Sequence, residues 1–319
     1  MNFKGWQIAT RIDAETVVPL DVIKDSIKEA YYDYGANVVR YQMIAPDPRW
    51  LGPIDAALDF RQWSFETYSH WWWSEIANIK ACCEMIRKEK MDIQILVDCH
   101  SAFKGVVADA DGRNSVQQIL LDDSYRQKFE YLWLKTVEDL FYDNSLRQIA
   151  GYGLCNEPAG SQLSWIRLAK KLTKKIRQQE KKLRAPRRWI FISTTSGVVH
   201  RLARLRLLKG AKVAVEVHLY CSGESKKLMR RCVKKKLRYV RQYSRRTGKP
   251  ILIGEMGASR YNSGPDEIAE FWGTILPALE RIPATKRGGG GGIIHALNEG
   301  AQWDVRATPS IDIIKEWMR

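Results

Sequence analysis

Two glutamates stand at the ends of short apolar segments that lie about a hundred residues apart. Glu157 closes the segment that begins near residue 148, and Pro158 after it cannot donate a ladder hydrogen bond, so a strand must end there. Glu255 closes the apolar run 250–255 in the same way. A carboxylate at the end of a buried strand is costly unless it is paired or functional. We therefore treat both glutamates as candidate catalytic groups.

Other polar side chains fall at the ends of other expected strands. Any one of these residues, taken alone, is best explained as a structural residue whose hydrogen bonds are satisfied. Their joint placement at one rim is hard to explain by packing. They are Arg40, His100, Asn156, His218, Tyr220, His295, Asn298 and Glu299. Two carboxyl groups in different protonation states suit glycosidic bond cleavage, since one protonates the leaving oxygen while the other attacks or activates water. A neighbouring arginine lowers the pKa of one carboxyl, and burial raises that of the other.

Eight apolar, strand-like segments alternate with helical ones, and this order must bring the candidate residues together. The expected strands are 3–9, 37–43, 92–98, 148–155, 189–193, 212–219, 250–255 and 293–297. The expected helices are 20–34, 72–89, 121–142, 162–182, 201–208, 224–243, 266–281 and 311–318. Such alternation predicts parallel strands with right-handed crossovers, in the α/β class. We expect a (β/α)8 TIM barrel that forms a single catalytic domain over residues 1–319, with the catalytic groups at the carboxyl ends of its strands.

The same motifs resemble a known clan of (β/α)8 glycoside hydrolases, which carry catalytic glutamates on the fourth and seventh strands. They are most similar to family 5, the cellulase-type family. The matching motifs are N-E-P at 156–158, G-E at 254–255, H-x-Y at 218–220, N-V-V-R at 37–40 and D-C-H at 98–100. N-E-P alone is a short and weak signal, whereas the set in this order and spacing is specific. The resemblance covers about residues 3 to 304.

This resemblance implies a retaining hydrolase that cleaves β-glycosidic bonds of a poly- or oligosaccharide by double displacement. Glu157 would be the acid/base and Glu255 the nucleophile. Arg40 and Tyr220 would form hydrogen bonds to the nucleophile, and Asn156 would bind the sugar 2-hydroxyl. His100 and His218 would line the site. The resemblance also favours a secreted or extracellular protein, although no secretory signal precedes the first strand.

One position departs from the family pattern. The family usually has a tryptophan near the end of the eighth strand as a floor for the sugar, and here His295 stands at that position. Trp303 follows eight residues later and could fill the same place. Trp50, in an expected loop after a strand, is the best other candidate for a stacking platform. Of the triplet 71–73, most members are expected in the core, because consecutive helical residues point in different directions.

Charge is distributed very unevenly along the chain. Residues 167–249 hold 28 Lys and Arg against 3 Asp and Glu, whereas the rest holds 24 against 33, which gives the net charge of +16. We interpret the basic segment as solvated outer helices rather than as a specific nucleic-acid surface, because few aromatic residues interleave the basic ones. The alternative function is a barrel that has lost efficient hydrolysis and binds glycans or polyanions.

The remaining motifs predict little additional chemistry. No metal and no cofactor is expected, since no zinc-type spacing occurs and 109–114 reads as a plain turn rather than a calcium loop. The six cysteines are interpreted as buried small side chains rather than disulfides. The glycines 288–292 predict a flexible loop before the last strand. We expect a monomer with a carbohydrate substrate and no membrane span.

Overall fold

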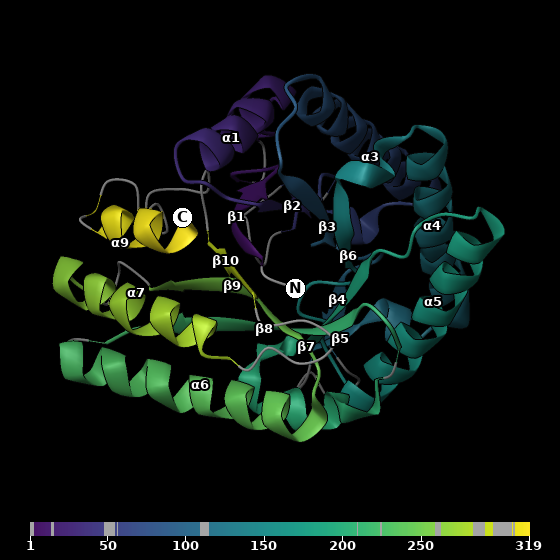
Figure 1. Cartoon of the computed structure of the whole chain (residues 1–319). Coiled ribbons are helices and arrows are strands. Elements are labelled where there is room, and N and C mark those ends of the chain that lie inside the picture. The colour runs from purple at the N-terminus through teal and green to yellow at the C-terminus, as the bar shows by residue number, and fades with distance from the viewer. Residues whose placement is uncertain are drawn as a thin grey trace.

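A closed barrel of eight parallel strands forms the centre of the molecule. The computed structural model describes residues 3–13, 16–47, 55, 57–108, 115–208, 210–223, 225–258, 263–282, 291–295, 308 and 310–319. Around the barrel the strands follow one another in the order β1-β10-β9-β8-β7-β6-β3-β2, with helices outside them (Figure 1). Neighbouring strands are parallel throughout this ring. The predicted (β/α)8 TIM barrel is therefore confirmed.

The barrel strands are short and mostly buried on both faces, which explains their nearly continuous apolar sequences. They are β1 Lys4–Ala9, β2 Val38–Met43, β3 Gln94–Cys99, β6 Ile149–Gly153, β7 Trp189–Val198, β8 Val213–Cys221, β9 Ile251–Ala258 and β10 Gly291–Ile294. A separate two-stranded antiparallel sheet, β4 Val106–Ala108 with β5 Ser115–Gln117, lies outside the barrel and was not predicted.

Among the described residues, seven α-helices lie outside the barrel, and four of them begin at a Ser or Asp side chain that accepts from the first turn. The seven helices are α1 Leu20–Tyr32, α3 Phe65–Lys88, α4 Asp123–Tyr142, α5 Gln162–Lys182, α6 Lys226–Thr247, α7 Pro265–Glu280 and α9 Ser310–Met318. The hydroxyl groups of Ser64, Ser161 and Ser225 cap α3, α5 and α6. Because Ser64 caps α3, that helix starts seven residues before the predicted position 72. The predicted helix 201–208 is instead the 3-10 helix η4, Val199–Leu207.

Alternation along the barrel strands separates an apolar base from a polar layer above it. One apolar side chain from each strand or its flank closes the base: Phe3, Val38, Leu96, Ala150, Phe191, Ala214, Leu252 and Ile293. Two residues further along β2, β3 and β8 come Arg40, Asp98 and Glu216, which are all buried. Since side chains two apart share one face of a strand, these charged groups point into the barrel above its apolar base.

Two glycines expected in a flexible loop belong to the last strand. Gly291 and Gly292 pair with Leu252 and Ile253 of β9, so the loop prediction was wrong for these two residues. A Cβ on Gly292 would lie 2.7 Å from the Cε of Met256, so a larger residue would force that side chain to move. The other three glycines of the run, 288–290, lie outside the described residues.

One disulfide corrects the interpretation of the cysteines. Cys221, at the end of β8, is bonded to Cys232 on α6. The other four cysteines are free and buried, as expected of small apolar side chains. Sequence spacing could not find this pair, because the two residues meet only when α6 folds back onto β8. No helix in the described part of the chain is long and apolar enough to cross a bilayer.

Candidate active site

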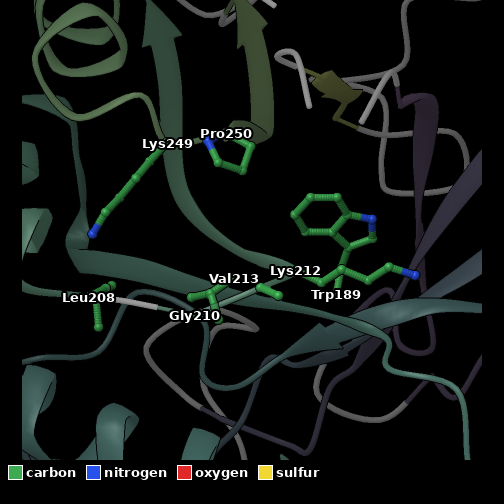
Figure 2. A pocket seen from close by; sticks show the side chains of 8 residues that line it. Trp189, Leu208, Gly210, Lys212, Val213, Lys249 and Pro250 are labelled. Atoms are coloured by element: carbon green, nitrogen blue, oxygen red, sulfur yellow. The ribbon is translucent and has the colours of Figure 1, made fainter. Parts of the chain in front are cut away.

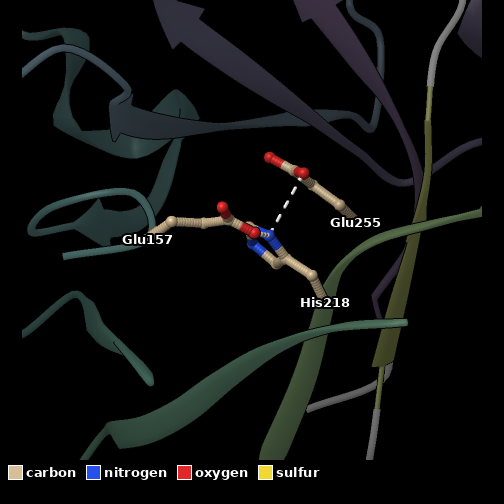
Figure 3. A group of neighbouring side chains, drawn as sticks. All are labelled: Glu157, His218 and Glu255. Atoms are coloured by element: carbon tan, nitrogen blue, oxygen red, sulfur yellow. Dashed lines mark hydrogen bonds and ion pairs between the residues drawn. The ribbon is translucent and has the colours of Figure 1, made fainter. Parts of the chain in front are cut away.

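The two candidate glutamates face each other at the carboxyl ends of their strands. Glu157 follows β6 in a turn with a positive φ of 36°, and Glu255 lies within the last part of β9. One carboxylate oxygen from each, together with a ring nitrogen of His218, lie within 4.8 Å of one another. Figure 3 shows the His218 ring between the two carboxylates. The structure thus brings residues a hundred positions apart into one group.

Both oxygens of Glu255 are held by donors. Arg40 Nη1 donates to Oε1 at 2.6 Å, and the Tyr220 hydroxyl donates to Oε2 at 2.7 Å. The same Arg40 nitrogen also donates to Oε1 of Gln7 at 2.8 Å. Burial alone would raise the pKa of Glu255, but the positive charges of His218 and Arg40 hold that pKa well below its usual range. Glu255 is therefore an oriented, ionised carboxylate.

Arg40 is itself fixed by two further buried carboxylates that the sequence analysis did not single out as site residues. Its Nη2 lies 3.0 Å from Oδ1 of Asp98 and 2.9 Å from Oε1 of Glu216. Burial disfavours the guanidinium cation, but the surrounding carboxylates of Asp98, Glu216 and Glu255 raise the pKa of Arg40 above its ordinary value. The signal for both residues was a charged side chain at an inward position of an otherwise apolar strand.

His218 links the two candidate glutamates. Its Nδ1 lies 2.6 Å from Oε1 of Glu157 and 3.1 Å from Oε2 of Glu255, and its Nε2 is 3.5 Å from Oε1 of Glu216. Burial lowers the pKa of His218, but the charge of Glu255 and the hydrogen bonds to Glu157 and Glu216 outweigh it and raise this pKa to about 10. At neutral pH the ring is an imidazolium that bridges two carboxylates.

His100 and Asn156 form a second polar pair beside Arg40. Oδ1 of Asn156 accepts from Arg40 Nη2 at 2.9 Å, and its Nδ2 is 3.2 Å from Nε2 of His100. Nδ1 of His100 lies 3.0 Å from Oδ2 of Asp98 and 3.0 Å from Nε2 of Gln42. These contacts fix the orientation of both side chains at the rim.

His295 lies at the end of β10, where the family pattern has a tryptophan. Its ring packs edge-on against Tyr220 with centroids 5.4 Å apart, and its Nδ1 is hydrogen-bonded to Nε2 of Gln7. The residue is 9% exposed, so its ring presents little open surface for stacking. Trp50 and Trp303, the predicted platform candidates, lie outside the described residues, as do Asn298 and Glu299.

The sequence places this site in a known family. Residues 8–282 match the family described as Cellulase (glycosyl hydrolase family 5). The chain belongs to glycosyl hydrolase family 5. It is a glycoside hydrolase, as the motifs around Glu157 and Glu255 predicted.

Solved structures with the same fold are similar to this hydrolase over nearly its whole length. Endoglucanase Cel5A of Pseudomonas stutzeri is 16% identical, with a TM-score of 0.65 and coverage of 99% of this chain and 94% of that one. A GH5-4 broad specificity endoglucanase from an uncultured bacterium is 15% identical, with a TM-score of 0.65 and coverage of 99% and 92%. Cellulose synthase subunit Z of Clostridioides difficile is 15% identical, with a TM-score of 0.61 and full coverage of both chains. None of the curated proteins searched is significantly similar in sequence.

The end of β7 supplies a backbone feature of the site that sequence analysis missed. Ser196 and Gly197 both have positive φ, and Ser196 N donates to the carbonyl of Pro158 at 3.2 Å. A Cβ on Gly197 would lie 2.3 Å from Oε1 of Glu157 and 2.8 Å from Nδ1 of His218. The hydrolase therefore needs glycine at this position to seat the glutamate against the histidine. The sequence did contain a signal for this feature, since Ser196 and Gly197 directly follow a run rich in β-branched residues.

Helix α6 fixes the strand end that carries Tyr220. The disulfide joins Cys221 to Cys232, and one helical turn later Lys236 Nζ donates to the backbone carbonyl of Tyr220. Burial lowers the pKa of Lys236, which is consistent with its position between the helix and the strand. Residues 232 and 236 lie on the same face of a helix, so both contacts act on one segment.

The tryptophans of α3 lie in and beside the core. Trp72 is fully buried and donates from Nε1 to Oγ1 of Thr136 at 2.9 Å. Trp71 and Trp73 are partly buried and pack against the same cluster. This arrangement agrees with the expectation that most of the triplet serves packing.

Glu157, His218 and Glu255 also have the donor set of a metal site, since their ligand atoms lie within 4.8 Å of one another. A metal would have to displace the proton of His218, because the pKa of this ring is raised to about 10 by the carboxylates around it. The protonated His218 ring already offsets the negative charges of the two carboxylates, as a bound metal ion would. The expectation of a metal-free site remains a prediction.

A separate hollow of about 600 Å³ lies at the opposite end of the barrel (Figure 2). It is lined by residues at the starts of β7, β8 and β9, including Trp189, Lys212 and Lys249. The described residues that line it include no carboxylate. In parallel barrels catalysis occurs at the carboxyl ends of the strands, and the hollow is at the amino ends. We assign the chemistry to the glutamate group and not to this hollow.

Proposed function

We propose that this family 5 hydrolase cleaves β-glycosidic bonds of a poly- or oligosaccharide with retention of configuration, as an endoglucanase-like enzyme. The observation that carries the proposal is the pair of carboxylate oxygens of Glu157 and Glu255 within 4.8 Å. Retaining enzymes separate their carboxyl groups by about 5–5.5 Å, whereas inverting enzymes need about 6.5–9.5 Å to admit a water molecule. Direct attack by one carboxylate on the anomeric carbon fits the shorter separation.

Glu255 suits the role of nucleophile. Arg40 and Tyr220 each donate to one of its oxygens, and the depressed pKa keeps the group ionised. These donors orient the carboxylate towards the site mouth and hold it in place while the glycosyl–enzyme bond forms. The cost of burying Arg40 is offset by Asp98 and Glu216, which remain paired with it throughout.

Glu157 suits the role of acid/base because its carboxyl lies close to that of the nucleophile and is held by Nδ1 of His218 at 2.6 Å. In this role it protonates the leaving oxygen in the first step and, once the leaving group has departed, accepts a proton from the attacking water.

Sugar contacts would come from the residues around this pair. One N–H of Asn156 faces His100, and its second N–H remains available for a sugar hydroxyl next to the reacting carbon. Tyr220 and His295 provide a floor of two small rings. Since several structural neighbours are endoglucanases by name, a β-linked glucan is the first substrate to test.

The decisive experiment measures turnover of an aryl β-glycoside by the wild type, Glu255→Ala and Glu157→Gln. Each variant should lose at least about a thousandfold in kcat/KM while its circular dichroism and melting transition stay native-like. Azide should rescue Glu255→Ala and yield the α-glycosyl azide. It should rescue Glu157→Ala and yield the β-azide. Unchanged turnover in either of the first two variants, or the reverse stereochemistry, would refute the assignment.

The alternative of a barrel without efficient hydrolysis that binds glycans or polyanions has two observations in its favour, the basic residues 167–249 and the compact floor at His295. Against it stands the complete set of donors around Glu255, which a binding protein would not need. The alternative would be favoured if the wild type turned over the aryl β-glycoside more slowly than Glu255→Ala does in the presence of azide. A screen of reducing-sugar release over neutral β-glucans, mannans and xylans would then identify any substrate.

A further inference from the structure

Helix α6 carries a strongly basic outer face that the proposed chemistry does not use. Its sequence contains eleven Lys and Arg and no Asp or Glu. The buried residues Met229, Val233, Leu237 and Val240 turn one face towards the barrel. Figure 1 places the helix at the outer edge of the molecule, with α7 beside it. The face turned away from the barrel and from α7 is therefore available to meet a partner.

Three of the α6 cations already have structural partners. Lys226 pairs with Asp266 at 3.0 Å, and Arg230 pairs with Glu270 at 2.7 Å; both partners belong to α7. Lys236 is directed to the carbonyl of Tyr220. These three contacts explain why part of the helix is basic, but they leave most of its positive charge without an explanation.

Six of the other eight cations form a line along the outward side of the helix. They are Lys227, Arg231, Lys234, Arg238, Arg241 and Arg245. Successive steps of four and three residues keep these side chains on one face. The line extends about 27 Å, with one cation about every 5 Å along the axis. Among the described residues none of the six has an ion pair with a carboxylate, and we call them the α6 stripe.

The α6 stripe has the form of a site for a linear anion. An open hollow of about 640 Å³ is lined by six described residues, all cationic: four from the stripe together with Arg230 and Lys235. Six like charges in a row repel one another, which costs stability unless an opposite charge offsets it. A polymer with one negative group per unit of about 5 Å would match the row. One carboxylate or sulfate on each pyranose ring gives a spacing of that order.

Features of α6 argue against two other polyanions. Proteins that bind single-stranded nucleic acid add exposed aromatic residues, but Tyr243 is buried and Tyr239 partly buried. Helices that lie on a membrane add an apolar row, whereas Leu228 is the single large apolar side chain well exposed on α6. The disulfide of Cys221 and Cys232 fits an oxidising environment, where acidic polysaccharides occur.

We propose that the α6 stripe binds an acidic polysaccharide and so holds the hydrolase on a matrix that contains uronate or sulfated chains. The helix starts five residues after Cys221, at the end of the strand that carries His218 and Tyr220. A chain bound along the stripe is thus led towards the catalytic end of the barrel. Binding at the stripe and hydrolysis at the glutamates use separate residues, so each can fail without the other.

The test compares the wild type with a stripe variant in which Lys227, Arg231, Lys234 and Arg238 are all changed to Gln. Polygalacturonate binding is measured at increasing salt concentration. The stripe variant should bind at least about tenfold more weakly at low salt. The slope of log Kd against log salt concentration should be smaller by about 2 to 4 than that of the wild type. Turnover of a short neutral aryl glycoside should stay unchanged.

A matched control removes the same charge from α5 by changing Lys170, Lys174, Lys181 and Lys182 to Gln. This variant should keep most of the affinity for polygalacturonate. If both variants lost affinity equally, the binding would depend on net charge and not on the α6 stripe, and the proposal would be overturned. Tighter binding of the wild type to duplex DNA of equal charge, or to vesicles with phosphatidylserine, would also overturn it, because it would assign the stripe to a different partner.

Discussion

Nδ1 of His218 lies 2.6 Å from Oε1 of Glu157. The same nitrogen is 3.1 Å from Oε2 of Glu255, so a single proton on this ring acts on both candidate catalytic carboxylates. The pKa of His218 is raised to about 10, because the charge of Glu255 and the hydrogen bond to Glu157 outweigh the burial that would lower it. This geometry predicts that His218 sets the pH range in which the nucleophile is ionised.

The substitution His218→Asn should therefore shift the acid limb of the kcat/KM profile to higher pH. Its cause is the loss of the largest favourable charge acting on Glu255, whose pKa then rises. We expect kcat/KM at the optimum to fall by roughly 10²–10³ as well, as for the loss of one preorganised donor. The measurement is a pH–rate profile with an activated aryl glycoside.

Tyr220→Phe is the matched control for that profile. It removes the hydroxyl that donates to Oε2 of Glu255 but leaves the charge of His218 in place. Its acid limb should move less than that of His218→Asn. An acid limb that stays at the wild-type pH in His218→Asn would contradict the role given to the imidazolium.

Stability should depend on the same proton at alkaline pH. The folded-state pKa of His218, about 10, lies above its ordinary value of 6.5. The folded state therefore gains stability from the charged ring, fully below about pH 6.5 and progressively less as pH rises to 10. The difference in unfolding free energy between the wild type and His218→Gln should shrink across this interval. Urea unfolding at pH 6, 8 and 10 measures it, and a constant difference would disprove the linkage.

The sequence was sufficient to predict the barrel, and six of its eight expected strands end in a distinctive polar side chain. Glu157 and Glu255 could be paired because parallel strands present their carboxyl ends at one rim. Asp98 and Glu216 were not recognised as partners of Arg40, because the sequence does not show which inward-facing residues of different strands lie at the same height in the barrel. Strand register fixes that height, and the register is seen only in the folded barrel.

Two other misses have the same origin in long-range contacts. The pairing of Cys221 with Cys232 depends on how α6 packs on β8, and cysteine spacing carries no information about that packing. Gly291 and Gly292 resemble a flexible loop by composition, but pairing with β9 and close contact with neighbouring side chains make them strand residues. Local propensity is overridden in both cases by tertiary structure.

Gly197→Ala should impair the site more than the fold. A Cβ at this position would meet Oε1 of Glu157 at 2.3 Å, and the backbone has a φ of 63° that disfavours side chains. We expect at least about a hundredfold loss in kcat/KM and a loss of about 1–3 kcal/mol in unfolding free energy. Gly273→Ala on α7 is the control, since nothing lies within 4 Å of its Cβ. It should keep full activity and gain about 0.5–1 kcal/mol.

The disulfide should stabilise the enzyme measurably. Cys221 and Cys232 close a loop of 11 residues, for which chain entropy gives about 2–3 kcal/mol. Cys232→Ser should lower the unfolding free energy by about this amount, and dithiothreitol should lower that of the wild type equally while leaving the variant unchanged. Cys83→Ser, at a buried free cysteine, should retain sensitivity to dithiothreitol. A wild type that does not respond to reduction under conditions that expose its thiols would contradict the bond.

Lys236 should affect catalysis only through Tyr220. Its amino group donates to the Tyr220 carbonyl, so Lys236→Met frees the strand end that aligns the tyrosine hydroxyl with Glu255. We expect kcat to fall about three- to tenfold with KM little changed, because the hydroxyl acts on the nucleophile and not on substrate binding. Lys235→Met, on the exposed side of the same helix, should leave both constants unchanged. In a Tyr220→Phe background the effect of Lys236→Met should disappear, since there is no hydroxyl left to align; an undiminished effect in the double variant would show that Lys236 acts by another route.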